Sequence, residues 1–261
     1  MSTMRAPLPS PRKGGLAEVV STNDGVWSER LRLDRERAGQ HQSAELASVT
    51  LAVQERARAA GAEALLLTGS TARGRRTLVS DLDYHVIGIG SLKVPEVRGD
   101  IDLYVDESDR FWKKLRSGDD FVHWSVWYGC ILFDSGVVRD AADYVASHNA
   151  WPDSERKHPQ ARRALTFAEQ LAETGDYGAA LEQVRGALSL TARWFLLSHD
   201  VFPLARDELS EQLERLGQRD LARDLRCSIH NRPSITDLRE SLKGAHLLLD
   251  ARQSLGQRFA A

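Results

Sequence analysis

The sequence predicts an α+β domain up to about residue 150, followed by an all-helical domain. Two observations support this prediction. Short apolar runs of strand length alternate with helical patterns up to Gly136, whereas only helical patterns follow Ala161. Residues 152–160, PDSERKHPQ, are polar, include two prolines and are expected to link the two domains.

The first domain is expected to span residues 26–150. Its four short apolar runs predict strands, and its amphipathic segments predict helices. Gly61 and Gly118 are expected to end two of these helices. The predicted strands are 62–69, 81–89, 100–105 and 130–136, and the predicted helices are 26–40, 43–61, 70–76, 108–118, 119–129 and 137–151.

The second domain is expected to span residues 161–257 and to contain helices only. Leu181, Val184, Leu188 and Thr191 mark one apolar face of its second helix. The predicted helices are 161–174, 178–199, 205–217, 219–230 and 235–255.

Composition excludes several classes of protein. The 261-residue chain has a formal net charge of −2, so it lacks the overall basic signature of a nucleic-acid binder. Its two cysteines argue against a disulfide scaffold, and no apolar run is long enough for a membrane span. Residues 1–25 are rich in Pro, Ser and Gly, have no apolar core of a signal peptide and are expected to be a disordered tail. A cytoplasmic protein is the expectation.

A pair of aspartates in a predicted strand is the first sign of chemistry. Residues i and i+2 of a strand face the same way, so Asp81 and Asp83 point together while Leu82 points into the core. Two adjacent carboxylates repel each other, and a divalent cation resolves this repulsion. All-oxygen sites suit Mg²⁺ or Mn²⁺, and Mg²⁺ is typically completed by substrate phosphates.

A Gly-Ser turn precedes this pair and is suited to bind phosphate. A turn from a strand into a helix presents backbone N–H groups to an anion. Gly69 allows the backbone to approach closely, and the Ser70 hydroxyl can donate to a phosphate oxygen. Arg73 is the preferred charged helper, and at least one of Arg75 and Arg76 is expected to be solvated.

The sequence resembles the signature of the DNA polymerase β-like nucleotidyltransferase superfamily. The resemblance is carried by Gly69-Ser70, a spacer of ten residues and Asp81-Leu82-Asp83. The resemblance covers about residues 43–135 and is nearest to the smaller bacterial branch, which includes aminoglycoside nucleotidyltransferases and the minimal nucleotidyltransferases of toxin–antitoxin pairs. It implies a nucleotidyltransferase domain with a small mixed β-sheet and flanking helices, followed by an all-helical bundle domain.

The resemblance also implies a third carboxylate on the following strand. Asp102 in DIDLYV fits best, and Asp100 is the alternative. Asp81, Asp83 and Asp102 would then be the catalytic residues and hold two metal ions, with Asp102 holding the catalytic metal or acting as base. The co-substrate is an NTP, and an acceptor hydroxyl attacks its α-phosphorus and releases pyrophosphate.

Three functions are compatible with these residues. The leading hypothesis is transfer of a nucleoside monophosphate, for example from ATP, to a small-molecule hydroxyl. The acidic middle third, with twelve Lys/Arg against sixteen Asp/Glu in residues 61–160, suits a cationic, aminoglycoside-like acceptor and hence a role in antibiotic resistance. The alternatives are a tRNA or protein acceptor, as in toxin–antitoxin systems, and a non-catalytic nucleotide-binding module.

Several other residues have a functional and a structural interpretation. His85 shares the face of Asp81 and Asp83, so it either reaches phosphate or acceptor or is a buried, hydrogen-bonded side chain; the second is favoured. Arg223 and His230 match an Arg-x6-His spacing of some ribonuclease domains, although a surface helix is favoured. The remaining candidates are Glu182, Asp207 and Glu208 as an acceptor-binding acid or base, Trp112, Trp124 and Trp127 as packing residues, and Cys130 as a buried small side chain.

Overall fold

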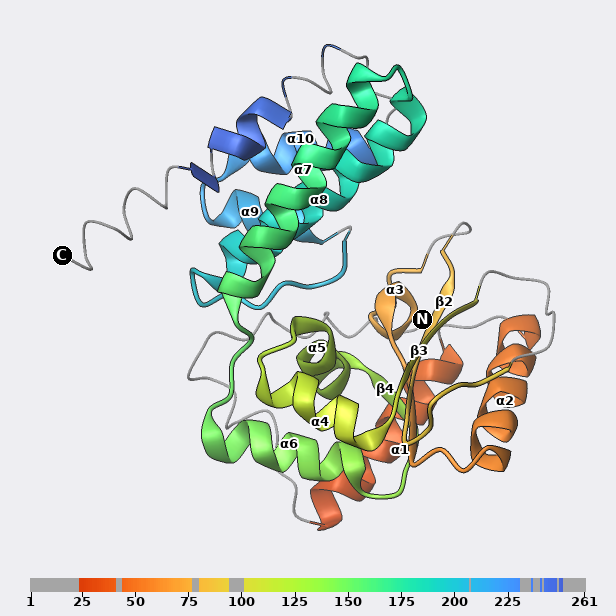
Figure 1. The fold of residues 1–261 in the computed structure, drawn as a ribbon. Coiled ribbons are helices and arrows are strands. Elements are labelled where there is room, and N and C mark those ends of the chain that lie inside the picture. The colour runs from red at the N-terminus through yellow and green to blue at the C-terminus, as the bar shows by residue number, and fades with distance from the viewer. Residues whose placement is uncertain are drawn as a thin grey trace, which may run out of the picture. The chain divides into compact units, whose positions relative to one another are not determined.

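The chain divides into two compact units, Met1–Pro152 (unit 1) and Asp153–Ala261 (unit 2) (Figure 1). The computed structural model describes residues 24–40, 44–76, 80–93, 101–206, 208–230, 236, 240, 242–247 and 249–250. The tail predicted over residues 1–25 lies outside the described residues, except that the first helix already begins at Asp24. Among the described residues, no helix is both long and apolar enough to cross a membrane.

Unit 1 contains a mixed four-stranded sheet, as predicted. Its strands are β1 (Ala64–Leu67), β2 (Leu82–Ile87), β3 (Ile101–Asp106) and β4 (Cys130–Asp134). They lie in the order β3-β2-β1-β4, with β1 antiparallel to both neighbours and β2 parallel to β3. All four predicted strands are present, and every residue of the central strand β1 is buried. The strand β3, which carries the third carboxylate, is an edge strand.

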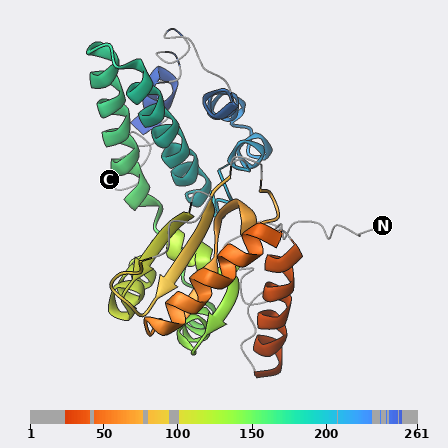
Figure 2. The same ribbon diagram turned by 90° about the vertical axis from the view of Figure 1, so that its right-hand side faces the viewer.

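Helices cover both faces of this sheet. α4, α5 and α6 lie on one side and α2 lies on the other, as the two views at right angles show (Figures 1 and 2). The short helix α3 follows β1 directly. The helices of unit 1 are α1 (Asp24–Gln40), α2 (Ala44–Ala59), α3 (Gly69–Ala72), α4 (Ser108–Arg116), α5 (Asp120–Tyr128) and α6 (Val137–His148). The α+β class predicted for this part of the chain is therefore confirmed.

Helix α1 covers the outer edge of β4 with polar side chains. The backbone N–H of Ile131 donates to Asp34 Oδ2 at 3.2 Å, and Arg35 Nε donates to the carbonyl of Leu132 at 3.3 Å. Arg37 Nε lies 3.1 Å from the Sγ of Cys130, a buried residue as predicted. Burial raises the pKa of this thiol to about 11, so it is un-ionised at neutral pH. These contacts use backbone groups that an uncovered edge strand leaves unpaired.

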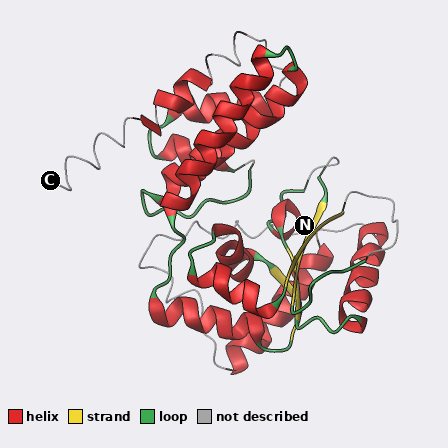
Figure 3. Ribbon diagram, in the orientation of Figure 1, coloured by secondary structure: helices red, strands yellow, loops and turns green. Residues whose placement is uncertain are grey.

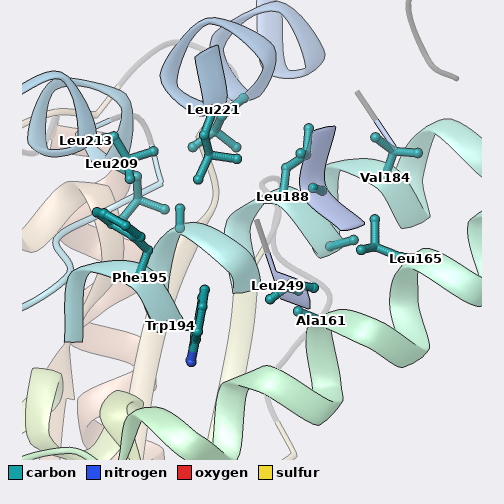
Figure 4. Packing of buried hydrophobic residues seen from close by; sticks show 14 of the residues in the cluster. Ala161, Leu165, Val184, Leu188, Trp194, Phe195, Leu209, Leu213, Leu221 and Leu249 are labelled. Carbon is teal, nitrogen blue, oxygen red and sulfur yellow. The ribbon is translucent and has the colours of Figure 1, made fainter. Parts of the chain in front are cut away.

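The described residues of unit 2 form helices joined by loops (Figure 3). The main helices are α7 (Lys157–Glu173), α8 (Tyr177–Leu197), α9 (Leu209–Arg215) and α10 (Arg219–His230). Their apolar faces meet in one core, which includes Leu165, Val184, Leu188, Trp194 and Leu213 (Figure 4). Burial of Val184, Leu188 and Thr191 confirms the predicted face of α8. The all-helical expectation for this part of the chain is met by the residues described.

Two boundaries in unit 2 differ from those predicted. The linker expected over 152–160 is wrong in its second half, because a 3₁₀ turn covers Ser154–Arg156 and α7 begins at Lys157. Pro159 is in the first turn of α7. A backbone N–H in this turn has no partner within the helix, so a proline there costs no hydrogen bond. The helix predicted over 205–217 begins only at Leu209. Much of the helix predicted over 235–255 lies outside the described residues, although 242–247 are helical.

Candidate active site

Three aspartates meet where β2 and β3 begin. Asp81 directly precedes β2, Asp83 is its second residue, and Asp102 is the second residue of β3. The parallel register places Asp83 opposite Asp102. One carboxylate oxygen from each residue lies within 4.8 Å of the other two. We call Asp81, Asp83 and Asp102 the Asp triad.

The Asp triad fits a small divalent cation. Ligands on opposite sides of a Mg²⁺ ion with bonds of 2.1 Å are about 4.2 Å apart, so oxygens within 4.8 Å need only a small inward shift to share an ion. All three donors are carboxylate oxygens, the ligand type that Mg²⁺ and Mn²⁺ prefer. Asp81 and Asp83 are half-buried and Asp102 is exposed, so the site is open on the side of β3. The alternative residue Asp100 lies outside the described residues.

Gly69 lies directly against Asp83. Its φ of +64° is in the left-handed region, and a Cβ added there would be 1.9 Å from Asp83 Oδ2. The backbone N–H of Thr68 donates to the carbonyl of Asp83 at 2.8 Å, which ties the turn to β2. Sequence reasoning explained Gly69 by close approach to phosphate, but in the structure the group that it approaches is a carboxylate of the Asp triad.

The other residues of the turn separate into distinct environments. Ser70 is half-buried in the first turn of α3, next to Gly69. Arg73 follows α3, and its guanidinium carbon lies 4.9 Å from the ring centroid of Tyr128. Arg75 is exposed, in line with the expectation of a solvated arginine, and Arg76 Nη2 donates to the carbonyl of Ser80 at 2.7 Å. The structure therefore places Gly69, Ser70 and Arg73 on the turn beside the Asp triad.

Tyr128, the aromatic partner of Arg73, was missed by sequence reasoning. It is the last residue of α5 and is buried. A guanidinium that stacks on an aromatic face is held in a fixed orientation, with its N–H donors around the edge of the stacked plane. No local sequence signal joins Tyr128 to Arg73, because the contact is made between segments 55 residues apart.

His85 is a buried structural residue, as the favoured interpretation held. It is fully buried, and burial lowers its pKa, so it is neutral at pH 7. Its Nε2 lies 3.3 Å from Asp106 Oδ2, and its Nδ1 lies 3.1 Å from Ser125 Oγ. Because a carboxylate only accepts, Nε2 carries the proton and Nδ1 is an acceptor. The Ser125 hydroxyl also lies 3.0 Å from the carbonyl of Phe121, so its single proton is shared between that oxygen and Nδ1. Both nitrogens are engaged, so His85 does not reach a phosphate or an acceptor.

Asp106 is the centre of this network. Lys114 Nζ donates to both of its carboxylate oxygens at 2.7 and 2.8 Å, and Arg110 Nε lies 3.2 Å from Oδ1. Burial opposes ionisation, but the hydrogen bonds from His85 and Lys114 and the charge of Lys114 outweigh it and lower the pKa of Asp106 to about 2. The network fixes the end of β3 to α4, the helix that carries Lys114.

Replacing Asp106 with asparagine is expected to lower the free energy of unfolding by about 2 kcal/mol, because it leaves a partly buried Lys114 without its carboxylate. A pKa lowered in the folded state gives stability that is present above about pH 4 and is lost as the pH falls towards 2. Urea unfolding at pH 7 and at pH 2.5 measures both effects. The exposed Asp109 gives the control, since Asp109→Asn is expected to cost about 0.5 kcal/mol or less. An equal difference between wild type and Asp106→Asn at both pH values would contradict this account.

The remaining candidates are described by the contacts that each makes within its own unit. Arg223 is on the surface of α10 and forms ion pairs with Asp220 and Asp224, which agrees with the surface-helix interpretation. Glu182 pairs with Arg185 in α8, and Glu208 is buried in unit 2. Asp207 and the side chain of His230 lie outside the described residues. Trp124 and Trp127 are buried and Trp112 is partly buried, as expected for packing residues.

Comparisons with known proteins give a limited result. No protein-family model matches the sequence, and no curated protein matches it significantly. Solved structures do match, among them a nucleotidyltransferase-like protein from Exiguobacterium sibiricum 255-15, which is 20% identical with a TM-score of 0.41. That match covers 80% of this chain and 76% of the other. A likeness at this TM-score supports no assignment of function.

Proposed function

We propose that the protein transfers a nucleoside monophosphate from a metal-bound NTP to a hydroxyl of a small-molecule acceptor and releases pyrophosphate. The observation that carries this proposal is the convergence of three carboxylates within 4.8 Å, beside a Gly-Ser turn that contacts one of them. Two of the carboxylates come from β2 and its start and one from the edge strand β3. Such a site can bind a cation. On one side of that cation, the chain offers donors to phosphate.

The donor side of the site is the turn after β1. The Ser70 hydroxyl and the first N–H groups of α3 are suited to hold phosphate oxygens, since the first N–H groups of a helix have no partner within it. Arg73 adds positive charge, with its guanidinium oriented by Tyr128. Asp81 and Asp83 would hold Mg²⁺, which when bound neutralises charge on the triphosphate and aligns it.

The acceptor side is the edge strand β3. Asp102 is the most exposed member of the Asp triad. In the proposed reaction the acceptor oxygen forms a bond to the α-phosphorus, the bond from that phosphorus to the bridging α–β oxygen breaks, and its electron pair leaves with pyrophosphate. The acceptor proton passes to Asp102 if this carboxylate acts as base, and to water if it serves only as a metal ligand.

Replacing Tyr128 with leucine is expected to raise the KM for the NTP about fivefold, because the π face that orients Arg73 is lost. Tyr128→Phe keeps the face and is the matched control, with an expected change below twofold. The KM for the acceptor is expected to stay constant in both variants, since Arg73 serves the donor side. Equal KM values for the NTP in the two variants would contradict the assigned role of the ring.

A screen of the four NTPs against hydroxyl-bearing acceptors, read by pyrophosphate release in the presence of Mg²⁺, tests the proposed function. Cationic acceptors such as aminoglycosides are the first to include, because residues 61–160 are acidic. The expected result is release that requires the NTP, the acceptor and Mg²⁺ together. Absence of release across the panel, with label transferred instead to RNA or a protein band in cell extract, would replace the small-molecule acceptor by a macromolecule.

A further inference from the structure

An exposed tyrosine lies beside the Asp triad. Tyr104 is two residues after Asp102 on β3, so both side chains point to the same face of the sheet, about 6.6 Å apart along the strand. Its relative exposure is 45%, although it belongs to a strand whose face is elsewhere covered by α4 and α5. An exposed aromatic ring this close to a carboxylate cluster is a surface that a ligand of the cluster can contact.

The ring of Tyr104 is supported from beneath. Its centroid lies 4.4 Å from that of Phe121 in α5, with 40° between the ring planes. Phe121 in turn lies 5.1 Å from the ring of His85, which is held by Asp106 and Ser125. The contacts of Phe121 and His85 therefore hold the ring of Tyr104 in a fixed position. A ring fixed in this way loses little conformational freedom when a ligand stacks on it.

The strand order places Tyr104 on the acceptor side. The Gly69-Ser70 turn follows β1, on one side of β2, whereas Tyr104 is on β3, on the other side of β2. In-line displacement at phosphorus requires the acceptor and the leaving pyrophosphate to lie on opposite sides of the reacting phosphorus. A ring on β3 is thus placed to contact the acceptor and not the triphosphate.

We propose that Tyr104, supported by Phe121, is a specificity-determining residue that binds a ring of the acceptor face to face. This inference rests on the proposed nucleotidyl transfer for its assignment to the acceptor. The chemistry selected is a hydroxyl-bearing compound with a six-membered sugar ring or a planar base, because the flat C–H face of a sugar and the π face of a base both stack on a tyrosine ring. Open-chain polyols lack such a face.

Calorimetric titration with Mg²⁺ and a non-hydrolysable ATP analogue present tests this proposal. The probes are kanamycin for a sugar ring, adenosine for a planar base and sorbitol for an open chain. At least one ring probe is expected to bind, with a Kd raised about tenfold in Tyr104→Ala and changed less than twofold in Tyr104→Phe. Tyr177→Ala is the matched control, because Tyr177 is also an exposed tyrosine, with 42% exposure, and lies in α8 of unit 2.

Each result decides the proposal. Tyr104-dependent binding of kanamycin identifies a sugar acceptor, and the same result with adenosine identifies a nucleoside. The proposal is overturned if neither ring probe binds, if Tyr104→Ala binds them as wild type does, or if sorbitol shows the same dependence on Tyr104. Ring binding that depends on Tyr104, combined with no pyrophosphate release from Mg–ATP in a separate turnover assay with the same probe, would instead refute the transfer reaction and keep the ring site. Pyrophosphate release with an unchanged acceptor KM in Tyr104→Ala would keep the reaction and refute the ring site.

Discussion

Replacing Asp83 with asparagine is expected to abolish nucleotidyl transfer and to weaken Mg²⁺ binding about 100-fold or more. Asp83 is the member of the Asp triad that contacts the Gly-Ser turn, and it lies opposite Asp102 in the parallel register of β2 and β3. Asparagine keeps the shape of the side chain but removes the charge that a hard cation requires. The measurements are the rate of pyrophosphate release and the rise in Tm that Mg²⁺ produces.

The same variant separates metal binding from folding. Loss of one of three clustered negative charges relieves repulsion, so the Tm of the metal-free Asp83→Asn protein is expected to stay within about 3 °C of wild type. Only the rise in Tm on adding Mg²⁺ is expected to disappear. Asp140→Asn, which removes an exposed carboxylate from α6, is the matched control and is expected to keep both activity and the Mg²⁺ effect. Retention of the Mg²⁺ effect in Asp83→Asn would show that the ion binds elsewhere.

Replacing Gly69 with alanine is expected to have the second largest effect, with the rate of transfer lowered about 100-fold or more. The new Cβ would be 1.9 Å from Asp83 Oδ2, so either this carboxylate or the turn has to move. A displacement of about 1 Å in a catalytic arrangement is enough for a loss of this size. The positive φ of +64° adds strain of about 1 kcal/mol.

Gly61→Ala is the control that separates the two causes. Gly61 has a similar φ of +81°, but a Cβ there meets nothing within 4 Å. Both variants are expected to lose stability through backbone strain, whereas only Gly69→Ala is expected to lose transfer and Mg²⁺ binding. Urea unfolding and pyrophosphate release on the same two variants make the comparison. If Gly61→Ala loses as much activity as Gly69→Ala, contact with Asp83 is not the reason for the glycine.

The strands of unit 1 could be predicted because each is a short apolar run that ends at Gly or at acidic residues. The orientation of Asp81 and Asp83 followed from strand geometry, since Leu82 is buried and the two carboxylates meet on one face. Their proximity to Asp102 was expected only through a family resemblance, because nothing in the local sequence states that β2 and β3 are parallel neighbours.

Contacts between distant segments could not be predicted. The contact of Arg73 with Tyr128 joins the turn after β1 to α5. The contact of Tyr104 with Phe121 joins the strand β3 to the same helix. The sequence shows that these residues are aromatic or charged, but the packing of α5 on the sheet decides which pairs meet. The burial of His85 depends on the same packing, since its partners Ser125 and Asp106 come from α5 and from the end of β3.

The boundary error at residues 152–160 has a local cause. Pro159 and the surrounding charges favoured a linker, yet a proline in the first turn of a helix costs no hydrogen bond. The rule that proline breaks helices applies to helix interiors, and α7 begins only two residues before Pro159. Ala161 and Leu165, at helical spacing after it, are buried in the core of unit 2 and account for a helix that starts earlier than predicted.

In the proposed reaction, the Asp triad directs attack at the α-phosphorus of an NTP. Parallel reactions with α-labelled and γ-labelled ATP, Mg²⁺ and an acceptor that supports turnover in the screen test it most directly. The α label is expected to move to the acceptor while the γ label is recovered in pyrophosphate, and Asp83→Asn is expected to give neither product. Transfer of the γ label to the acceptor, or its release as inorganic phosphate, would contradict it.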